Sequence, residues 1–247
     1  MHRDLPVGEP EWIVNFPPDL VLQSRGDDPL NARISVTLDA FSRPVLRFRI
    51  RPRPRAADVQ VFVCHFKSKR PTQVSGETWF RKAPDRFAPH AAAIGAALST
   101  IRRTAEAAAL RVILNGIMQK TRTPVIVLGD LNDGGASNTL AILTEQPPLL
   151  RPLSTGGRDS ALYATEALQE QIAQRDVLYT YVHEGVHGTL DHILVSEEFY
   201  AASRRRMWAF EGLDAYNDHL NDPRHVAEEG ASDHGVVRAR FRWAPAG

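Results

Sequence analysis

Histidine, aspartate and asparagine side chains recur at or beside the ends of four apolar segments of the sequence. The four motifs are Cys64-His65-Phe66-Lys67-Ser68, Gly129-Asp130-Leu131-Asn132, Leu190-Asp191-His192 and Ser232-Asp233-His234. Strand ends are where a rigid scaffold can hold polar groups around a cleft. Each motif alone would be ordinary turn chemistry or a hydrogen-bonded histidine, but the four together predict one shared site.

Hydrolysis of a phosphate ester suits this set of side chains. The reaction needs an in-line water, a group that takes or orients its proton, and charge stabilisation for the phosphoryl oxygens. Asp130, Asn132 and Asp233 supply oxygen atoms. His65 and His234 supply imidazoles. A hard cation with oxygen ligands commonly provides the remaining positive charge in such sites.

The residue types also exclude other chemistries. A histidine paired with a carboxylate such as Asp191 is held in one tautomer and is favoured as the imidazolium. No GxSxG motif or phosphate-cradling glycine loop is present to support acyl transfer or nucleotide binding. The single cysteine, Cys64, excludes an internal disulfide framework and a cysteine-rich zinc site. Mg²⁺ suits the carboxylates better than Zn²⁺ does.

Apolar strands must position these groups. The sequence predicts strands at 45–50, 59–66, 125–128, 190–195 and 235–243. Segments 45–50 and 235–243 alternate apolar residues with others, many of them arginines, which is typical of half-buried strands. Segment 59–66 is almost uniformly apolar, which is typical of a strand covered on both faces.

Helices are predicted between the strands. An Ala-rich segment from Pro89 to about Gln119 places apolar residues at helical spacing, which indicates one buried stripe. The stripe consists of Ile94, Leu98, Ile101, Ala105, Ala108 and Val112. Shorter helices are expected at 137–143 and 160–174. Since no repeat or linker divides the chain, we expect one domain over 1–247, with the motifs within about 42–243.

The composition is that of a folded soluble protein. Hydrophobic residues make up 43% and charged residues 24% of the chain, which excludes a disordered or fibrous protein. The net charge is +1, so recognition of phosphate must be local. No apolar run reaches the roughly 20 residues of a spanning helix, and the first residues have no signal-peptide pattern. A cytoplasmic location is the default, and a secreted one applies if a signal peptide precedes Met1.

The motifs and their order resemble those of the endonuclease/exonuclease/phosphatase superfamily, which has the DNase I-like fold. The matching segments are HFKSK at 65–69, GDLND at 129–133, LDHILVS at 190–196 and SDHG at 232–235. The resemblance implies a four-layer α/β sandwich of two mainly antiparallel sheets flanked by helices. It also implies a hydrolase of phosphodiesters or phosphomonoesters that depends on Mg²⁺, or on Mn²⁺. HFKSK is similar to a motif of bacterial nucleases in this superfamily, which favours nucleic acid as the substrate.

The resemblance assigns a role to each residue of the motifs. His234 takes the place of the catalytic histidine, with Asp191 as its carboxylate partner. Asp233 matches a metal-linked aspartate. Asp130 and Asn132 match the pair that orients the attacking water and the phosphate.

The remaining roles concern the opposite side of the substrate. His65 matches a histidine that contacts the scissile phosphate from that side. Lys67 and Ser68 would lie nearby as phosphate ligands. A solvated loop after a strand is an equally good interpretation of these two residues.

The sequence departs from the family near its start. Family members begin with a strand bearing an asparagine, followed by a helix and a strand that ends in a metal-binding glutamate. Neither is found here, and segment 19–24, with Ser24 where the carboxylate belongs, is interpreted as a chance match. We expect a truncated form of a longer enzyme, inactive as this chain if the absent asparagine and glutamate are required, rather than an inactive relative or an enzyme with a substitute ligand.

Clustered arginines support a competing hypothesis. Arginines alternate through 47–55 and recur at 204–206. They could make the chain a catalytically silent fragment that binds phosphate polymers or a protein partner, because phosphate neutralisation supplies most nonspecific affinity for nucleic acid. Alternating arginines also fit protection of an edge strand, the interpretation we favour. The oligomeric state is left open.

Overall fold

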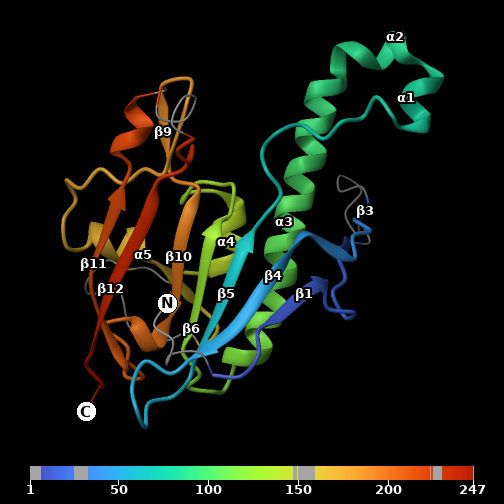
Figure 1. Ribbon diagram of the computed structural model, residues 1–247. Coiled ribbons are helices and arrows are strands. Elements are labelled where there is room, and N and C mark those ends of the chain that lie inside the picture. The colour runs from blue at the N-terminus through green and yellow to red at the C-terminus, as the bar shows by residue number, and fades with distance from the viewer. Residues whose placement is uncertain are drawn as a thin grey trace.

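A six-stranded sheet forms the centre of the protein in this computed structural model, which describes residues 7–24, 33–146, 149, 159–222, 224 and 230–246 (Figure 1). In spatial order its strands are β1 (Glu11–Asn15), β4 (Ala40–Ile50), β5 (Val59–His65), β6 (Val125–Asp130), β10 (Asp191–Ser196) and β7 (Leu162–Ala164). Strands β5 and β6 run parallel, and the other neighbouring pairs of this sheet are antiparallel.

Two helices cover one face of this sheet. The long helix α3 (Ala91–Met118) crosses the sheet, and the shorter α4 (Asn138–Thr144) packs beside α3 (Figure 1). Side chains of both layers are fully buried where they meet, among them Phe62 and Val127 of the sheet and Leu110 and Leu114 of α3. Because buried apolar area is the main stabilising contribution to folding, this contact fixes α3 against β5 and β6.

A second sheet covers the other face. It consists of β11 (Trp208–Tyr216) and β12 (Val236–Trp243), which pair antiparallel (Figure 1). Val61 and Val195 of the larger sheet pack in one cluster with Trp208 of β11. Helix α5 (Thr165–Glu170) contacts both β10 and β11. The sandwich is thus built from a six-stranded and a two-stranded sheet in the described part of the chain.

Smaller elements complete the described fold. They are β2 (Gln23–Ser24), β3 (Ile34–Ser35), α1 (Thr78–Lys82), α2 (Pro84–Phe87), β8 (Tyr181–His183), β9 (Val186–Gly188) and 3₁₀ turns at Ala88–His90, Glu197–Phe199 and Asp218–Asn221. Strands β8 and β9 form a hairpin that precedes β10. No helix in the described residues combines the length and apolarity needed to cross a membrane.

The predicted buried stripe of α3 has one buried member, Ala105, and three half-buried ones, Ile94, Ala108 and Val112. It is wrong in its first half. Leu98 and Ile101 are 41% and 44% exposed, whereas Ser99, Arg103 and Glu106 are buried. The reason is that this half of α3 packs over polar loops rather than over the sheet: Ser99 donates a hydrogen bond to a carbonyl of the loop after β5, and Arg103 contacts the loops after β5 and β6.

Two further expectations are corrected by the sheet topology. Segment 160–174 was expected to be one helix, but its residues Leu162–Ala164 pair with β10 as β7, and the helix is confined to Thr165–Glu170. The arginines of β4 do not protect an edge, because β4 lies between β1 and β5. Arg47 instead hydrogen-bonds Glu11 and Gln60 on these two neighbours.

Candidate active site

Strand register brings three of the expected site residues to one end of the large sheet. His65 ends β5, Asp130 ends β6 and Asp191 begins β10. The parallel pairing of β5 with β6 sets His65 beside Asp130, and the antiparallel pairing of β6 with β10 sets Asp191 on its other side. Adjacent strands lie about 5 Å apart, so these three residues form a row across the sheet end.

A glycine makes the close approach of β5 and β6 possible at this row. Gly129 has φ +129°, and a Cβ atom there would lie 2.1 Å from the carbonyl oxygen of Cys64. No side chain fits at that separation. The neighbouring pair, His65 and Asp130, is therefore set at its spacing by a contact between two backbones.

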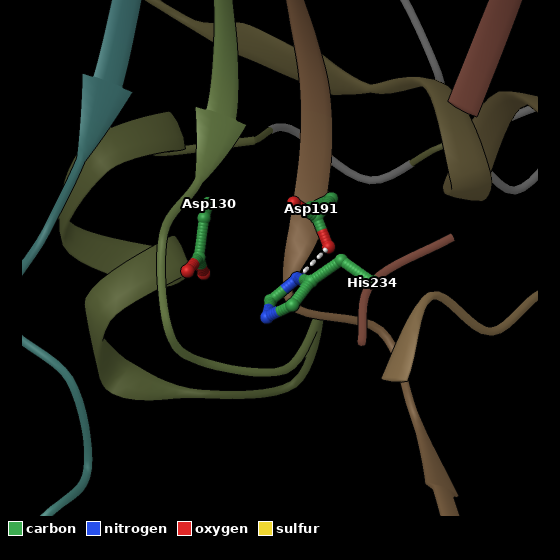
Figure 2. Close-up of side chains that lie close together, drawn as sticks. All are labelled: Asp130, Asp191 and His234. Atoms are coloured by element: carbon green, nitrogen blue, oxygen red, sulfur yellow. Dashed lines mark hydrogen bonds and ion pairs between the residues drawn. The ribbon is translucent and has the colours of Figure 1, made fainter. Parts of the chain in front are cut away.

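His234 reaches the row from the segment that precedes β12. The Gly235 N–H donates to the Thr180 carbonyl, which fixes this segment beside β8. His234 Nδ1 lies 2.7 Å from Asp191 Oδ2, and Figure 2 shows the imidazole between the carboxylates of Asp191 and Asp130. Burial lowers the pKa of His234, but its hydrogen bond to Asp191 and the charge of that carboxylate outweigh burial, so the pKa is raised.

Asn132 orients Asp130. Its backbone N–H donates to Asp130 Oδ1 at 2.8 Å, and its side-chain Nδ2 donates to Asp130 Oδ2 at 3.0 Å and to the Phe66 carbonyl at 3.0 Å. Asn132 has φ +54°, a left-handed conformation that asparagine tolerates better than most residues do. Burial, with a smaller contribution from the charge of Asp191, raises the pKa of Asp130 despite these hydrogen bonds.

His65 lies on the opposite side of Asp130 from Asp191. Its Nε2 is 3.3 Å from Asp130 Oδ2, and about half of its side chain is exposed. Burial and the nearby charge of Arg43 lower the pKa of His65, which favours the neutral imidazole. The two histidines of the site thus differ in the protonation state that their surroundings favour.

A cleft of about 780 Å³ opens over this row. Seven of the eight expected site residues line it: His65, Ser68, Asp130, Asn132, Asp191, Asp233 and His234. Lys67 is not among the residues that line the cleft, and its Nζ donates to the backbone carbonyls of Ser68 at 3.5 Å and Arg70 at 3.3 Å. The motifs thus converge on one cavity, with one exception in the loop after β5.

Five lining residues with charged or aromatic side chains were given no role by the motifs. Arg43, Lys69 and Arg70 bring cations from β4 and the loop after β5, while Tyr181 and His183 come from β8. The two aromatic residues have a period-2 spacing that could have indicated one face of a strand. Their rings lie 6.1 Å apart, and the Tyr181 ring lies 5.2 Å from that of His234. No comparable local signal identifies the three cations.

The donor set at the row fits a hard divalent cation. Ligand atoms of Asp130, Asp191 and His234 lie within 4.8 Å of one another, and carboxylate oxygens are the ligands that Mg²⁺ prefers. Among the described residues that line the cleft there is no glutamate. Ser24, at the end of segment 19–24, lies on β2 and lines a separate apolar groove beside α3.

Comparisons with known proteins agree on the fold. The sequence model described as Endonuclease/Exonuclease/phosphatase family matches residues 13–234. The human Nocturnin catalytic domain with bound sulfate has 15% identity and a TM-score of 0.51, and the match covers 99% of this chain but 62% of that one. This likeness supports a DNase I-like fold, and the chain spans less than two thirds of Nocturnin's length.

Two more distant solved structures belong to the same group of matches. D. rerio TDP2 complexed with single strand DNA product has 14% identity and a TM-score of 0.47, covering 97% of this chain and 69% of that one. The Bacteroides thetaiotaomicron mannosyl-6-phosphatase has 10% identity and a TM-score of 0.42, covering 81% and 57%. No curated protein sequence matches the chain.

Proposed function

Because the chain belongs to the Endonuclease/Exonuclease/phosphatase family, we propose that it contributes a metal-dependent phosphoesterase site acting on nucleic acid, as a nuclease or phosphodiesterase. The observation that carries the proposal is the Asp191–His234 hydrogen bond facing Asp130 inside a cleft at the sheet end. Residues distant in sequence line one cleft there, which supports hydrolysis of a phosphate ester as its chemistry.

His234 is the proton-transferring group in this proposal. Asp191 accepts from Nδ1, which leaves Nε2 as the atom that faces the substrate. The raised pKa favours the imidazolium, which stabilises the charge that develops on the phosphoryl oxygens and can give a proton to the leaving oxygen.

Asp130 acts on the attacking water. Its two oxygens are oriented by Asn132, and its raised pKa makes it a better proton acceptor than an ordinary aspartate. His65, favoured as the neutral imidazole, contacts the phosphate from the other side of Asp130. The two histidines then hold the phosphate between them.

A divalent cation fits the same end of the cleft. Asp233 would hold Mg²⁺ or Mn²⁺ beside the row where ligand atoms of Asp130, Asp191 and His234 lie within 4.8 Å of one another, with Asn132 as a neighbouring oxygen donor. The cation would supply positive charge beside the phosphoryl oxygens.

The walls of the cleft support nucleic acid as the substrate. Arg43, Lys69 and Arg70 can contact backbone phosphates, and the rings of Tyr181 and His183 can stack on bases. Base stacking tolerates any sequence, so we expect weak sequence preference.

The test is cleavage of a labelled single-stranded oligonucleotide with Mg²⁺ or Mn²⁺ and with EDTA. We expect cleavage that EDTA abolishes and that His234→Ala lowers at least about 100-fold, because general acid–base groups contribute that much. His90→Ala, an exposed histidine outside the cleft, is the matched control and should retain activity. Activity that survives EDTA, or His234→Ala as active as the control, would contradict the proposal.

The competing hypothesis of a catalytically silent binder has less support. Arg47 and Arg51 are paired with Glu11 and Asp58, and Arg206 donates to backbone carbonyls of Ala201 and Ala244. These arginines are therefore engaged within the protein. Salt-sensitive binding without turnover, unchanged by His234→Ala, would favour the silent binder.

A further inference from the structure

Lys69, rather than the expected phosphate ligand Lys67, lines the cleft. Its side chain lines the cleft wall and is 57% exposed, and its Nζ lies 3.2 Å from Asp133 Oδ1. Lys67 does not line the cleft, and its Nζ donates to the backbone carbonyls of Ser68 and Arg70. Of the two lysines in HFKSK, Lys69 is the one whose side chain lines the cleft and, among the described residues, is free of backbone acceptors in the same loop.

Asp133 joins Lys69 to the interior of the protein. Its Oδ2 accepts a hydrogen bond from Thr139 Oγ1 at 2.7 Å and another from Arg103 Nε at 3.2 Å. Asp133 itself does not line the cleft. Its carboxylate therefore holds the ammonium of Lys69 on one side and a helix of the core on the other.

Arg103 fixes this junction from α3. It is 4% exposed, and its NH1 also donates to the Lys67 carbonyl at 3.2 Å. One turn later, Glu106 is fully buried and accepts from the backbone N–H groups of Lys67 and Ser42, each at 2.7 Å. Helix α3 thus holds the loop that carries Lys69, because Glu106 and Arg103 hydrogen-bond the backbone N–H and the carbonyl of Lys67.

We propose that Lys69 is a phosphate-binding residue of the cleft and that Asp133 and Arg103 are positioning residues that hold its ammonium group there. The proposal deepens and rests on the proposed phosphoesterase function. Lysine is a point charge on a flexible stem, so anchoring it lowers the entropy lost when a phosphate binds.

The charges of Lys69, Asp133 and Arg103 explain why the Asp133 carboxylate does not neutralise the positive charge of Lys69. Two cations, Arg103 and Lys69, share one carboxylate, Asp133, so the group keeps a net positive charge. Because Arg103 is buried and Lys69 is exposed, the positive charge that a ligand can reach is that of Lys69. An anionic ligand then meets a preoriented cation rather than a neutral ion pair.

The experiment measures KM and kcat on the oligonucleotide, together with its affinity in the His234→Ala background. Lys69→Gln should weaken binding and raise KM by about fivefold to tenfold, with kcat changed by less than about twofold, as for loss of one charge-assisted contact. Lys82→Gln, an exposed lysine of α1, is the charge-matched control and should change neither quantity. A larger effect of Lys67→Gln than of Lys69→Gln would overturn the assignment.

Coupling tests the positioning role. Asp133→Asn should raise KM in the same direction, and Lys69→Gln with Asp133→Asn should bind no more weakly than Lys69→Gln alone, because both changes remove one interaction. Arg103→Lys should retain more affinity than Arg103→Gln, since it keeps a cation beside Asp133. Additive effects of the paired changes would show that Asp133 acts only on stability.

Two controls separate this inference from the proposed function. Circular dichroism of each variant checks folding, and Lys69→Gln removes no buried group. Competition by inorganic phosphate measures binding without turnover. If the wild-type chain binds phosphate through Lys69 but cleaves nothing, the proposed function is wrong and the role of Lys69 stands. If the chain cleaves the oligonucleotide and Lys69→Gln leaves KM unchanged, the proposed function stands and the role of Lys69 is wrong.

Discussion

The pKa values of the two histidines of the cleft are shifted in opposite directions because their neighbours differ. Asp191 accepts a hydrogen bond from His234 and places a negative charge beside it. Both effects raise the pKa of His234 above the ordinary value despite burial. His65 is partly buried near the cation Arg43, which lowers its pKa despite the charge of Asp130. Groups with opposite pKa shifts in one site can take different roles in acid–base chemistry.

The pH profile of cleavage tests the role of Asp191. In the proposed function His234 acts as the imidazolium; because its pKa is raised, activity should persist above the usual histidine pKa and fall as pH rises through the raised value. Asp191→Asn removes the charge, so this alkaline limb should move to lower pH and kcat should fall at least about 100-fold. Plots of log kcat/KM against pH measure both effects. An alkaline limb at the same pH in Asp191→Asn would contradict this role of Asp191.

Asn132 offers a test that separates orientation from backbone strain. Asn132→Gly and Asn132→Ala both remove the amide that orients Asp130, so both should lower kcat. Only alanine must adopt the left-handed conformation with a Cβ, which costs about 1 kcal/mol more in free energy of unfolding. Urea denaturation with kcat measurements checks the pair. Equal stability of the two variants would show that φ at this residue relaxes.

At the scale of elements, the strands that carry the site were predictable and α3's inward face was not. Segments 59–66 and 125–128 are apolar runs followed closely by or ending near His65 and Asp130. Both the strands and the polar residues at their ends can therefore be identified from the sequence. Ser99, Arg103 and Glu106 face inward because their partners are backbone groups of loops far away in the chain. Helical periodicity of apolar residues carries no information on such partners. Strand β1 was not predicted either. Four of its five residues are exposed, and apolar residues such as Trp12 and Val14 do not alternate with polar ones as in a half-buried strand.

Glu106 gives a stability prediction for α3. Its two carboxylate oxygens each accept a backbone N–H, and Glu106→Gln would present an NH₂ group to one of these donors. The buried mismatch should cost about 1–3 kcal/mol of unfolding free energy, whereas the exposed Glu170→Gln should cost almost nothing. Urea denaturation of both variants measures the difference. If Glu106→Gln leaves the free energy of unfolding unchanged, the loop after β5 is held by other contacts.

At the scale of the whole molecule, the site forms where the large sheet, the β8–β9 hairpin and the segment before β12 meet. The motifs supplied the central residues in chain order, so most of the site was predictable. Its walls were not, because Arg43 and Tyr181 belong to elements that approach the cleft only in the folded chain. The net charge of +1 gives no sign of the cations gathered there.

The salt dependence of oligonucleotide binding distinguishes the cleft from a broad arginine-rich surface. Three arginine and lysine side chains line the cleft: Arg43, Lys69 and Arg70. Neutralising about three phosphates of a single strand predicts a slope of log affinity against log salt of about −2. Arg43→Gln should reduce the magnitude of the slope by about 0.7. A slope steeper than about −4 would require contacts outside the cleft and would favour the competing hypothesis of a general polyanion binder.

The absence of a side chain at residue 129 has a consequence for how this site can vary. A methyl group there would push β5 and β6 apart, because it would clash with the backbone carbonyl of Cys64 and not with a side chain that can change its rotamer. The imidazole of residue 65 and the acid of residue 130 would then be moved apart although both remained in place along the chain. Alanine at this position would therefore resemble a catalytic knockout while leaving every reactive group intact.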